Sequence, residues 1–390
     1  MSHFDKVVDR RGTNCFKWDT VEDGVYSFTI ADSDYEVPKE VKAALLKRVE
    51  HGIFGYTIVP DSYYEAVINW CKRRYGFSIK QDDIIIMNKV LESIALLINL
   101  YTKEGDKIVI NPPVYPPFFS LTEGNNRELA LNHLINDNEY YSLDFEDLEN
   151  KFKEGAKMYI LCNPHNPVGK IYSKAEIEKI VKLCNKYDVF LVSDEIHSDL
   201  IIYGHKFTSV GKYFDLHDKM AICISPSKTF NIAGLKIANL VIKNEEIKAN
   251  VRKHLDCYKI GGASLLSLLA CEVAYNECEY WVVEQQKHLY KNYELARNYL
   301  NKEVPHLKFA SPESTYLLWI NLQYLNKTSA QIIEDLKKYK LAVNSGCDYC
   351  DNYDGYIRFN LACPESVLKE GLKRLVKYLK DQEKNKTNRL

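Results

Sequence analysis

A lysine beside two serines follows an apolar stretch of the chain, in the order Ser225, Ser227 and Lys228. Burial at the end of a strand would desolvate this lysine and lower its pKa, which favours attack by the amine on a carbonyl carbon. The two serine hydroxyls can donate hydrogen bonds to a phosphate group. Taken alone, however, the segment fits an ordinary lysine in a polar loop better.

Asp194 ends a second apolar stretch, and His197 follows it three residues later. A carboxylate in this position can pair with a protonated ring nitrogen and hold its positive charge. It can equally cap a following helix. His197 could bind Asp194 or a phenolic oxygen of a ligand, and it could equally be a structural histidine, so the residue types leave these roles open.

Two proline-rich turns hold further polar groups. The turn at residues 163–169 (NPHNPVG) would fix Asn166, so that its side-chain NH₂ group can donate to an anionic oxygen. The loop at residues 111–117 (NPPVYPP) would present Tyr115 as a flat surface for an aromatic ring. Either segment could also be a structural turn without a ligand.

Pyridoxal 5′-phosphate (PLP) requires the groups that these four segments offer. Its aldehyde needs a lysine, its pyridine nitrogen an acid, its phosphate a cluster of donors, and its ring a stacking surface. Lys228 could bind the aldehyde, Asp194 could pair with the ring nitrogen, and Tyr115 could stack on the ring. Each segment is ambiguous alone, but together they predict a PLP enzyme that acts on amino acids, with the cofactor bound to Lys228 as a Schiff base.

The same residues resemble those of a known superfamily. In the fold-type I PLP superfamily of aspartate aminotransferase, an Asn-Pro-x-Gly turn, a strand-end aspartate and an S-x-[SA]-K lysine occur in this order. Asn166, Asp194 and Lys228 match them, and the resemblance extends from about Asp9 to the last predicted helix. It implies an α/β three-layer sandwich, with a mostly parallel central sheet that binds PLP and a smaller α+β domain.

Several strings resemble more narrowly the cystathionine β-lyase, or C–S lyase, branch. They are DRRGTN (9–14), FGYT (54–57), NPPVYPPF (111–118), NPHNPVG (163–169), SDEIHSDL (193–200) and SPSKTFNIAGL (225–235). In that branch a histidine, here His197, replaces a tyrosine of aspartate aminotransferases. The resemblance also implies that Tyr56 reaches the phosphate of the neighbouring subunit's cofactor, which makes the active unit a homodimer.

A further resemblance concerns the substrate. Arg358, in the string GYIRFN, corresponds to an arginine that binds the substrate α-carboxylate. A planar guanidinium can bind a carboxylate through two hydrogen bonds, so the residue type suits this role. An exposed arginine on a strand is the alternative.

The chain also departs from the family pattern. Lys236 stands where many aminotransferases carry an arginine, and Lys89 replaces the usual glycine before a predicted helix. The backbone amides of Val90 and Leu91 could still bind the phosphate at the N-terminus of that helix. Residues 31–35 read ADSDY where the family has ADMDF, beside the expected substrate pocket, so the preferred side chain stays open.

These features predict a carbon–sulfur β-lyase that converts cystathionine- or cysteine-type amino acids to pyruvate, ammonia and a thiol. Lys228 would act as the general base, and Arg358 would orient the substrate. An aminotransferase would use the same site and is the alternative. A PLP-binding regulatory protein is a third hypothesis, against which the intact lysine, aspartate and arginine argue.

The segments between these residues predict the elements that position them. Continuous apolar runs predict strands covered on both faces, at residues 83–87, 107–111, 157–162, 189–194, 221–225 and 237–242. Helical patterns lie between them, at residues 90–101, 117–124 and 174–186. This alternation predicts a mostly parallel sheet with helices on both faces and ligands at the carboxyl ends of its strands.

The C-terminal third of the chain has a different pattern. It predicts a helix at about 277–300, strands at 311–322 and 355–361, and helices at 330–339 and 364–380. We therefore expect a large PLP-binding domain at 46–280 and a small α+β domain at 281–390, which the N-terminal segment 1–45 joins.

The composition excludes several classes of protein. A net charge of −1 gives no basic field for nucleic acid, and no long apolar run or signal peptide is evident. Eleven scattered cysteines predict reduced thiols and a cytoplasmic location. Cys347 and Cys350 form a C-x-x-C string without further ligands, so we interpret it as coincidence and expect no metal site.

Overall fold

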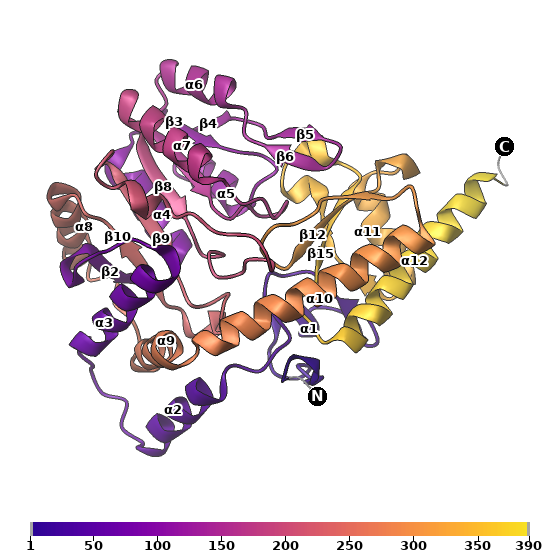
Figure 1. Ribbon diagram of the computed structural model, residues 1–390, viewed down its shortest axis with the longest axis horizontal. Helices are drawn as coiled ribbons and strands as arrows, with labels where there is room; N and C mark the ends of the chain where they lie inside the picture. Colours follow the sequence, from indigo (N-terminus) through magenta and orange to yellow (C-terminus); the bar gives the residue numbers. More distant parts are fainter. Residues whose placement is uncertain (1–2, 388–390) are drawn as a thin grey trace.

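The structure, a computed structural model that describes residues 3–387, is built around a seven-stranded sheet, the central sheet (Figure 1). Its order is β2-β10-β9-β8-β7-β3-β4. The strands are β2 Ile84–Met87, β3 Lys107–Ile110, β4 Glu128–Leu131, β7 Met158–Cys162, β8 Phe190–Asp194, β9 Met220–Ile224 and β10 Ala238–Val241. The pairs from β9 to β4 are parallel, whereas β10 is antiparallel to β2 and β9. This confirms the predicted mostly parallel sheet.

Helices cover both faces of the central sheet. Because side chains alternate along a strand, Val192 of β8 and Ile160 of β7 pack on one face, with side chains from α4 (Val90–Tyr101), α5 (Pro117–Gly124) and α8 (Glu245–Tyr258). Leu191 and Leu161 pack on the other face, with side chains from α3 (Asp61–Trp70), α6 (Phe145–Lys153), α7 (Lys174–Lys186) and α9 (Leu265–Glu277). The predicted three-layer sandwich is therefore confirmed.

A four-stranded antiparallel sheet, the small sheet, lies at the other end of the molecule. Its order is β11 (Lys308–Phe309), β12 (Leu317–Asn321), β15 (Tyr356–Asn360) and β14 (Asn344–Ser345). Apolar side chains of α10 (Glu279–Glu303), α11 (Ser329–Lys338) and α12 (Glu365–Thr387) pack with its strands in a separate core. Figure 1 shows α10 running along the molecule below both sheets.

The N-terminal segment lies beside the small sheet. Strand β1 (Tyr26–Ser27) pairs in parallel with β13 (Leu341–Ala342), and Asn360 on β15 donates its backbone N–H to Phe28. The other elements are α1 (Phe16–Asp19), α2 (Lys39–Glu50) and the hairpin β5 (Ile135–Asp137) to β6 (Tyr140–Ser142). The domain boundaries near residues 45 and 280 stay a prediction.

One predicted strand is shorter than expected. The apolar pattern predicts a strand over 311–322, but β12 begins only at Leu317. Thr315 has a φ of 66°, in the left-handed region, which interrupts an extended strand. The backbone N–H groups of Glu313 and Ser314 instead bind the carbonyl of Gly169, which ties this segment to the turn that carries Asn166.

The structure also bears on the expectations about a membrane span, the C-x-x-C string and a metal site. Within residues 3–387, no helix combines the length and the apolar character needed to span a bilayer. The thiol of Cys347 lies 3.2 Å from a carboxylate oxygen of Asp354, and both cysteines of the C-x-x-C string are free thiols. No group of three or more potential metal ligands occurs in the described part of the chain.

Candidate active site

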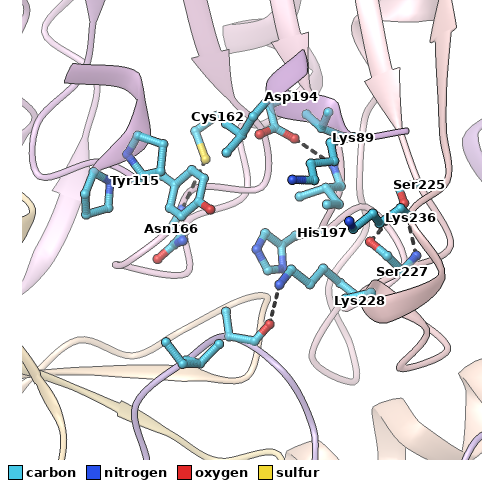
Figure 2. Close-up of a pocket in the computed structure, with 18 of the residues that line it drawn as sticks. Lys89, Tyr115, Cys162, Asn166, Asp194, His197, Ser225, Ser227, Lys228 and Lys236 are labelled. Atoms are coloured by element: carbon cyan, nitrogen blue, oxygen red, sulfur yellow. Dashed lines mark hydrogen bonds between the residues drawn. The ribbon is translucent and has the colours of Figure 1, made fainter. Parts of the chain in front are cut away.

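A cavity of about 370 Å³ lies where β7, β8 and β9 end (Figure 2). The start of α4 and residues of the small sheet close it, so both parts of the molecule contribute to its wall. It brings together all of the predicted site residues except Tyr56. These are Val90, Leu91, Tyr115, Asn166, Asp194, His197, Ser225, Ser227, Lys228 and Arg358.

Lys228 extends from the loop after β9 into this cavity, and its amine donates a hydrogen bond to the carbonyl of Ala31. Burial lowers the pKa of Lys228. The charge of Arg358 acts in the same direction, and the carboxylates of Asp32 and Asp194 oppose it. A lowered pKa increases the fraction of neutral amine, the form that attacks an aldehyde.

Asp194 is the last residue of β8, with Cα partners on both neighbouring strands. Its carboxylate is buried and accepts a hydrogen bond from the backbone N–H of Ile196 at 3.1 Å. Burial raises the pKa of Asp194 to about 7, although that hydrogen bond and the charge of Lys228 lower it. A cation placed against the carboxylate, such as a protonated pyridine nitrogen, would favour its charged form.

His197 is buried, and its Nδ1 has no hydrogen-bond partner among the residues that the structure describes. Burial lowers the pKa of His197 to about 3, so the ring is neutral near pH 7. In residues 3–387 we find no hydrogen bond between His197 and Asp194, while the ring lies 6.1 Å from that of Tyr316. Of the two polar roles that the sequence left open, contact with a bound ligand fits this geometry better.

Arg358 lies on β15 and is only 3% exposed, so it is not the exposed strand arginine considered as an alternative. One terminal nitrogen donates to the amide oxygen of Asn166 at 3.2 Å, and the other to Asn344 at 2.8 Å. The guanidinium carbon lies 5.2 Å from the centre of the Tyr349 ring, while Nε is buried and has no hydrogen-bond partner in the described part of the chain. The guanidinium is therefore held in one orientation before any ligand binds, and its Nε–H group remains available as a donor.

Asn166 is held in the turn after β7. Because its amide oxygen accepts from Arg358, its NH₂ group remains available to donate. The turn requires Gly169, which has a φ of 71°, and a Cβ there would lie 2.5 Å from Pro312 Cβ. The local sequence thus fixes the asparagine through a close approach that only glycine permits.

The opposite end of the cavity holds hydroxyl and backbone donors. The hydroxyl of Ser225 lies 2.6 Å from the carbonyl of Ile237, which accepts its one hydrogen, and 2.9 Å from the hydroxyl of Ser227. Of the two serines, Ser227 therefore has the hydrogen that a phosphate could accept. Within residues 3–387, no side chain caps the first turn of α4, so its first N–H groups remain open to a ligand. Lys89 has a φ of −146°, an extended conformation that does not require the family's glycine at this position.

Lys89 and Lys236 add positive charge to the cavity. Both line it, and Figure 2 shows their amino groups directed into the hollow. Neither lysine forms an ion pair with another of the residues that the structure describes. Ser225, Ser227 and Lys236 lie on one side of the view, and Tyr115 and Asn166 on the other, so the hydroxyl and amino groups are separated from the aromatic face and the amide (Figure 2).

Tyr56 does not line the cavity. It is fully exposed in the extended stretch between α2 and α3, where Ile53, Phe54 and Ile58 are also exposed. The site in a single chain therefore lacks this predicted residue. Tyr115, in contrast, is held against Phe118 with the two rings edge to face at 5.8 Å.

The sequence did not indicate three residues of the site. Asn344 and Tyr349 orient Arg358, and Tyr316 binds the carbonyl of Ala31. Tyr349 lies inside the C-x-x-C string. The interpretation of that string considered only its two cysteines, but Tyr349 lines the cavity. Tyr316 and Ala31 are 285 residues apart in the sequence, and Asn344 meets Arg358 through the pairing of β14 with β15, so no local spacing could have revealed these contacts.

The residues present fit PLP. A buried carboxylate whose pKa is raised can pair with the ring nitrogen, and a lysine whose pKa is lowered can bind the aldehyde. Open N–H groups of α4 and two unpaired lysines suit a phosphate, and the unpartnered Nδ1 of His197 is a further polar group for a ligand. Arg358 leaves a donor for a substrate carboxylate.

Comparison with known proteins places the chain in a family. The model of the aminotransferase class I and II family matches residues 24–375. Cystathionine beta-lyase PatB of Bacillus subtilis is 35% identical over 96% of this chain and 98% of its own length. Cystalysin of Treponema denticola, whose crystal structure contains PLP, has a TM-score of 0.94 at 33% identity and covers 98% of this chain and 99% of its own.

A PLP-bound protein of Clostridium difficile described as a putative aminotransferase has a TM-score of 0.92 at 38% identity. That structure covers 96% of this chain and 99% of its own. The motifs, the fold and these similarities agree, and the chain belongs to the aminotransferase class I and II family.

Proposed function

We propose that this chain is a PLP-dependent carbon–sulfur β-lyase that cleaves cystathionine- or cysteine-type amino acids to pyruvate, ammonia and a thiol. The observation that carries the proposal is the meeting of Lys228, Asp194 and Arg358 in one cavity. The relatives named cystathionine beta-lyase support the reaction type, because one of them is 35% identical over nearly the whole chain.

The cavity residues would hold the cofactor in one orientation. Asp194 would bind the ring nitrogen, Asn166 the phenolic oxygen, and Tyr115 a face of the ring. The N–H groups of Val90 and Leu91, with Ser227 and the two cavity lysines, would bind the phosphate. When bound, PLP supplies an electron-withdrawing ring that stabilises the electron pair released at the substrate α-carbon.

Arg358 would bind the substrate, and Lys228 would remove a proton from it. The guanidinium would bind the α-carboxylate and so orient the Cα–H bond toward the amine of Lys228, which takes the proton. The Cβ–S bond then breaks, and the sulfur leaves with a proton as a thiol. Water converts the remaining three-carbon enamine to pyruvate and ammonia, so atoms and electrons balance without a second substrate.

We further propose that the active unit is a homodimer in the cytoplasm. The exposed side chains of Ile53, Phe54 and Ile58 beside Tyr56 support a second copy of this chain as the partner, since a contiguous exposed apolar segment is typical of an interface. All eleven cysteines are free thiols, which supports a reducing compartment.

An aminotransferase is the second candidate, and the family assignment favours it directly. It would use the same lysine, aspartate and arginine, but it would return the proton to the cofactor and require a 2-oxo acid. The two reactions therefore differ in what they consume.

The deciding experiment incubates the PLP-loaded protein with L-cystathionine in the absence of any 2-oxo acid. We expect pyruvate, ammonia and a free thiol in equal amounts, and none of them from the Lys228→Ala variant. Borohydride treatment of the loaded protein should fix a pyridoxyl group on Lys228. If turnover requires a 2-oxo acid and yields a new amino acid, the aminotransferase replaces the lyase.

A further inference from the structure

The carbonyl oxygen of Ala31, a residue of the cavity wall, accepts hydrogen bonds from two side chains. One donor is the amine of Lys228, and the other is the hydroxyl of Tyr316, at 2.8 Å. A carbonyl oxygen has two lone pairs, so it can accept both bonds at once. Tyr316 is only 1% exposed, and the function described above gives it no role.

Asn360 fixes the backbone on both sides of Ala31. It is the last residue of β15, it is completely buried, and its NH₂ group donates to the carbonyls of Ile30 and Asp32, each at 2.7 Å. Its amide oxygen accepts from the backbone N–H of Ala362 at 2.7 Å, which establishes the orientation of the amide. With both flanking carbonyls engaged, the Ala31 carbonyl is left to face Lys228.

The loop of Lys228 is anchored to the same backbone segment. The side-chain NH₂ group of Asn231 donates to the carbonyls of Ser33 at 3.0 Å and Tyr35 at 2.7 Å. Arg10 donates to the Ser33 carbonyl as well, at 3.0 Å. The segment that carries the Ala31 carbonyl is therefore held by Asn360 from β15 and by Asn231 from the loop of Lys228.

We propose that Tyr316 and Asn360 are positioning residues that act through the Ala31 carbonyl and hold the Lys228 amine for proton transfer from a bound amino acid. This inference rests on the proposed role of Lys228 as the base. A carbonyl only accepts, so it takes one N–H of the amine and leaves the nitrogen lone pair directed elsewhere. The proton passes from Cα to that lone pair, while the bonding electrons stay with the substrate.

Preorganisation explains why such a contact matters. A lysine side chain has many rotamers, and each one that misdirects the amine slows the proton transfer. The groups charged near the amine are Asp32, Asp194 and Arg358, and they affect its charge rather than its direction. The Ala31 carbonyl supplies the direction.

The first test measures exchange of the α-hydrogen of L-alanine with deuterium from solvent in the PLP-loaded protein. Alanine has no sulfur leaving group, so the exchange reports proton removal whether or not the protein is a lyase. Loss of one hydrogen bond in Tyr316→Phe should slow the exchange about threefold to tenfold. The PLP affinity should stay within about twofold of the unmodified protein, because Tyr316→Phe removes only the hydroxyl and keeps the ring that lies against His197.

Tyr63→Phe is the matched control. Tyr63 is equally buried, on α3, and its hydroxyl donates to Asn239 at 2.7 Å, so the variant loses a similar hydrogen bond away from the cavity. We expect its exchange rate to match the unmodified protein. Asn360→Asp, which keeps the size but loses both N–H donors, should slow the exchange at least as much as Tyr316→Phe.

The second test needs no activity. A crystal structure of the PLP-free protein should show the Lys228 amine bound to the Ala31 carbonyl. A crystal structure of PLP-free Tyr316→Phe should show several conformers of the Lys228 side chain. Equal exchange rates in Tyr316→Phe and Tyr63→Phe would overturn the inference. An amine placed elsewhere in the PLP-free crystal would overturn it too. Failure to release pyruvate from cystathionine would refute only the lyase proposal.

Discussion

Asn166 and Arg358 are 192 residues apart in the sequence, yet the amide oxygen of Asn166 accepts an N–H of the Arg358 guanidinium at 3.2 Å. Asn166 follows β7 of the central sheet, and Arg358 lies on β15 of the small sheet. This hydrogen bond joins the residue proposed to bind the cofactor oxygen to the residue proposed to bind the substrate carboxylate. A displacement of β15 would therefore change the position of the substrate relative to the cofactor.

The first prediction concerns the shape of the Arg358 side chain. In Arg358→Lys a point charge replaces the planar fork, so the paired contacts to a carboxylate and to Asn166 and Asn344 cannot all form. We expect the KM for the amino acid to rise about 10-fold to 100-fold, the effect of losing one charge-assisted hydrogen bond. Steady-state kinetics with L-cystathionine measures this change.

Arg374→Lys provides the control, because Arg374 lies on α12 and pairs with Glu370 at the surface. Its KM should equal that of the unmodified protein. PLP affinity should be preserved in both variants. An unchanged KM in Arg358→Lys would show that another group binds the carboxylate.

The second prediction concerns the charge of Asp194. In Asp194→Asn the neutral amide cannot hold a pyridinium charge, so the variant should bind some PLP but turn over at least about 100 times more slowly. Absorbance measures the bound cofactor, and pyruvate release measures turnover. Undiminished turnover in Asp194→Asn would contradict the assigned role.

Local sequence signals predicted several elements well. The observed bounds of α4, α5 and α7 equal the predicted ones. Helix α7 shows why: Ser173 and Glu176 form a capping box that closes its first turn, and such a signal is readable in the sequence. Six of the seven central strands were found within one residue at each end, because strands covered on both faces are continuous apolar runs. The edge strand β4 was missed, since its burial pattern is mixed and its sequence, ELAL, is not a continuous apolar run.

Other features had no local signal. An apolar run does not encode strand direction, so the antiparallel course of β10 could not be read from residues 237–242. The site residues that follow strand ends were predictable, since parallel strands bring their carboxyl ends to one edge. Tyr316 and Asn360 bind backbone carbonyls of the N-terminal segment, 285 and 330 residues away, and Asn344 meets Arg358 through the pairing of β14 with β15, so only the folded chain reveals these contacts.

The third prediction concerns the phosphate of PLP. Lys89→Ala and Lys236→Ala each remove a cation from the cavity, so each should weaken PLP binding about fivefold, and the double variant more. Pyridoxal, which lacks the phosphate, is the matched ligand, and its affinity should not change. Equal weakening of both ligands would indicate that the lysines act on the structure of the cavity rather than on the phosphate.

The fourth prediction concerns acid stability and His197. Burial lowers the pKa of His197 from 6.5 to about 3, so between these values the unfolded chain binds a proton that the folded protein does not. The free energy of unfolding therefore falls as the pH drops from 6.5 toward 3, by about 1.4 kcal/mol per pH unit for this group. His197→Phe should remove that part of the slope.

Buried carboxyl groups oppose the acid destabilisation that His197 causes. The slope of stability against pH must therefore be compared between His197→Phe and the unmodified protein. Burial raises the pKa of Asp194 and of Glu195 to about 7, which makes the folded protein gain stability as the pH falls from 7 toward 4. Denaturant unfolding of PLP-free protein at several pH values gives the difference in slope. An equal slope in His197→Phe and in the unmodified protein would contradict the prediction.

The fifth prediction tests whether two chains share each site. Tyr56 is fully exposed in one chain and does not line the cavity, so its proposed contact with a phosphate requires a partner subunit. A Tyr56→Phe chain and a Lys228→Ala chain each carry one defect. In a hybrid dimer, the site with the intact Lys228 would receive an intact Tyr56 from the other chain, and the second site would carry both defects.

Unfolding the two variants together and refolding the mixture should therefore create intact sites that neither parent has. With random pairing half of the dimers are hybrids, and each hybrid has one intact site of two, so about a quarter of all sites in the mixture are intact. Refolding each variant alone is the control, and at limiting PLP each should be less active than the mixture. If the mixture gives only the average of its parents, Tyr56 does not act across the interface. A monomer that keeps full activity on dilution would refute the shared site as well, because a lone chain places Tyr56 in solvent.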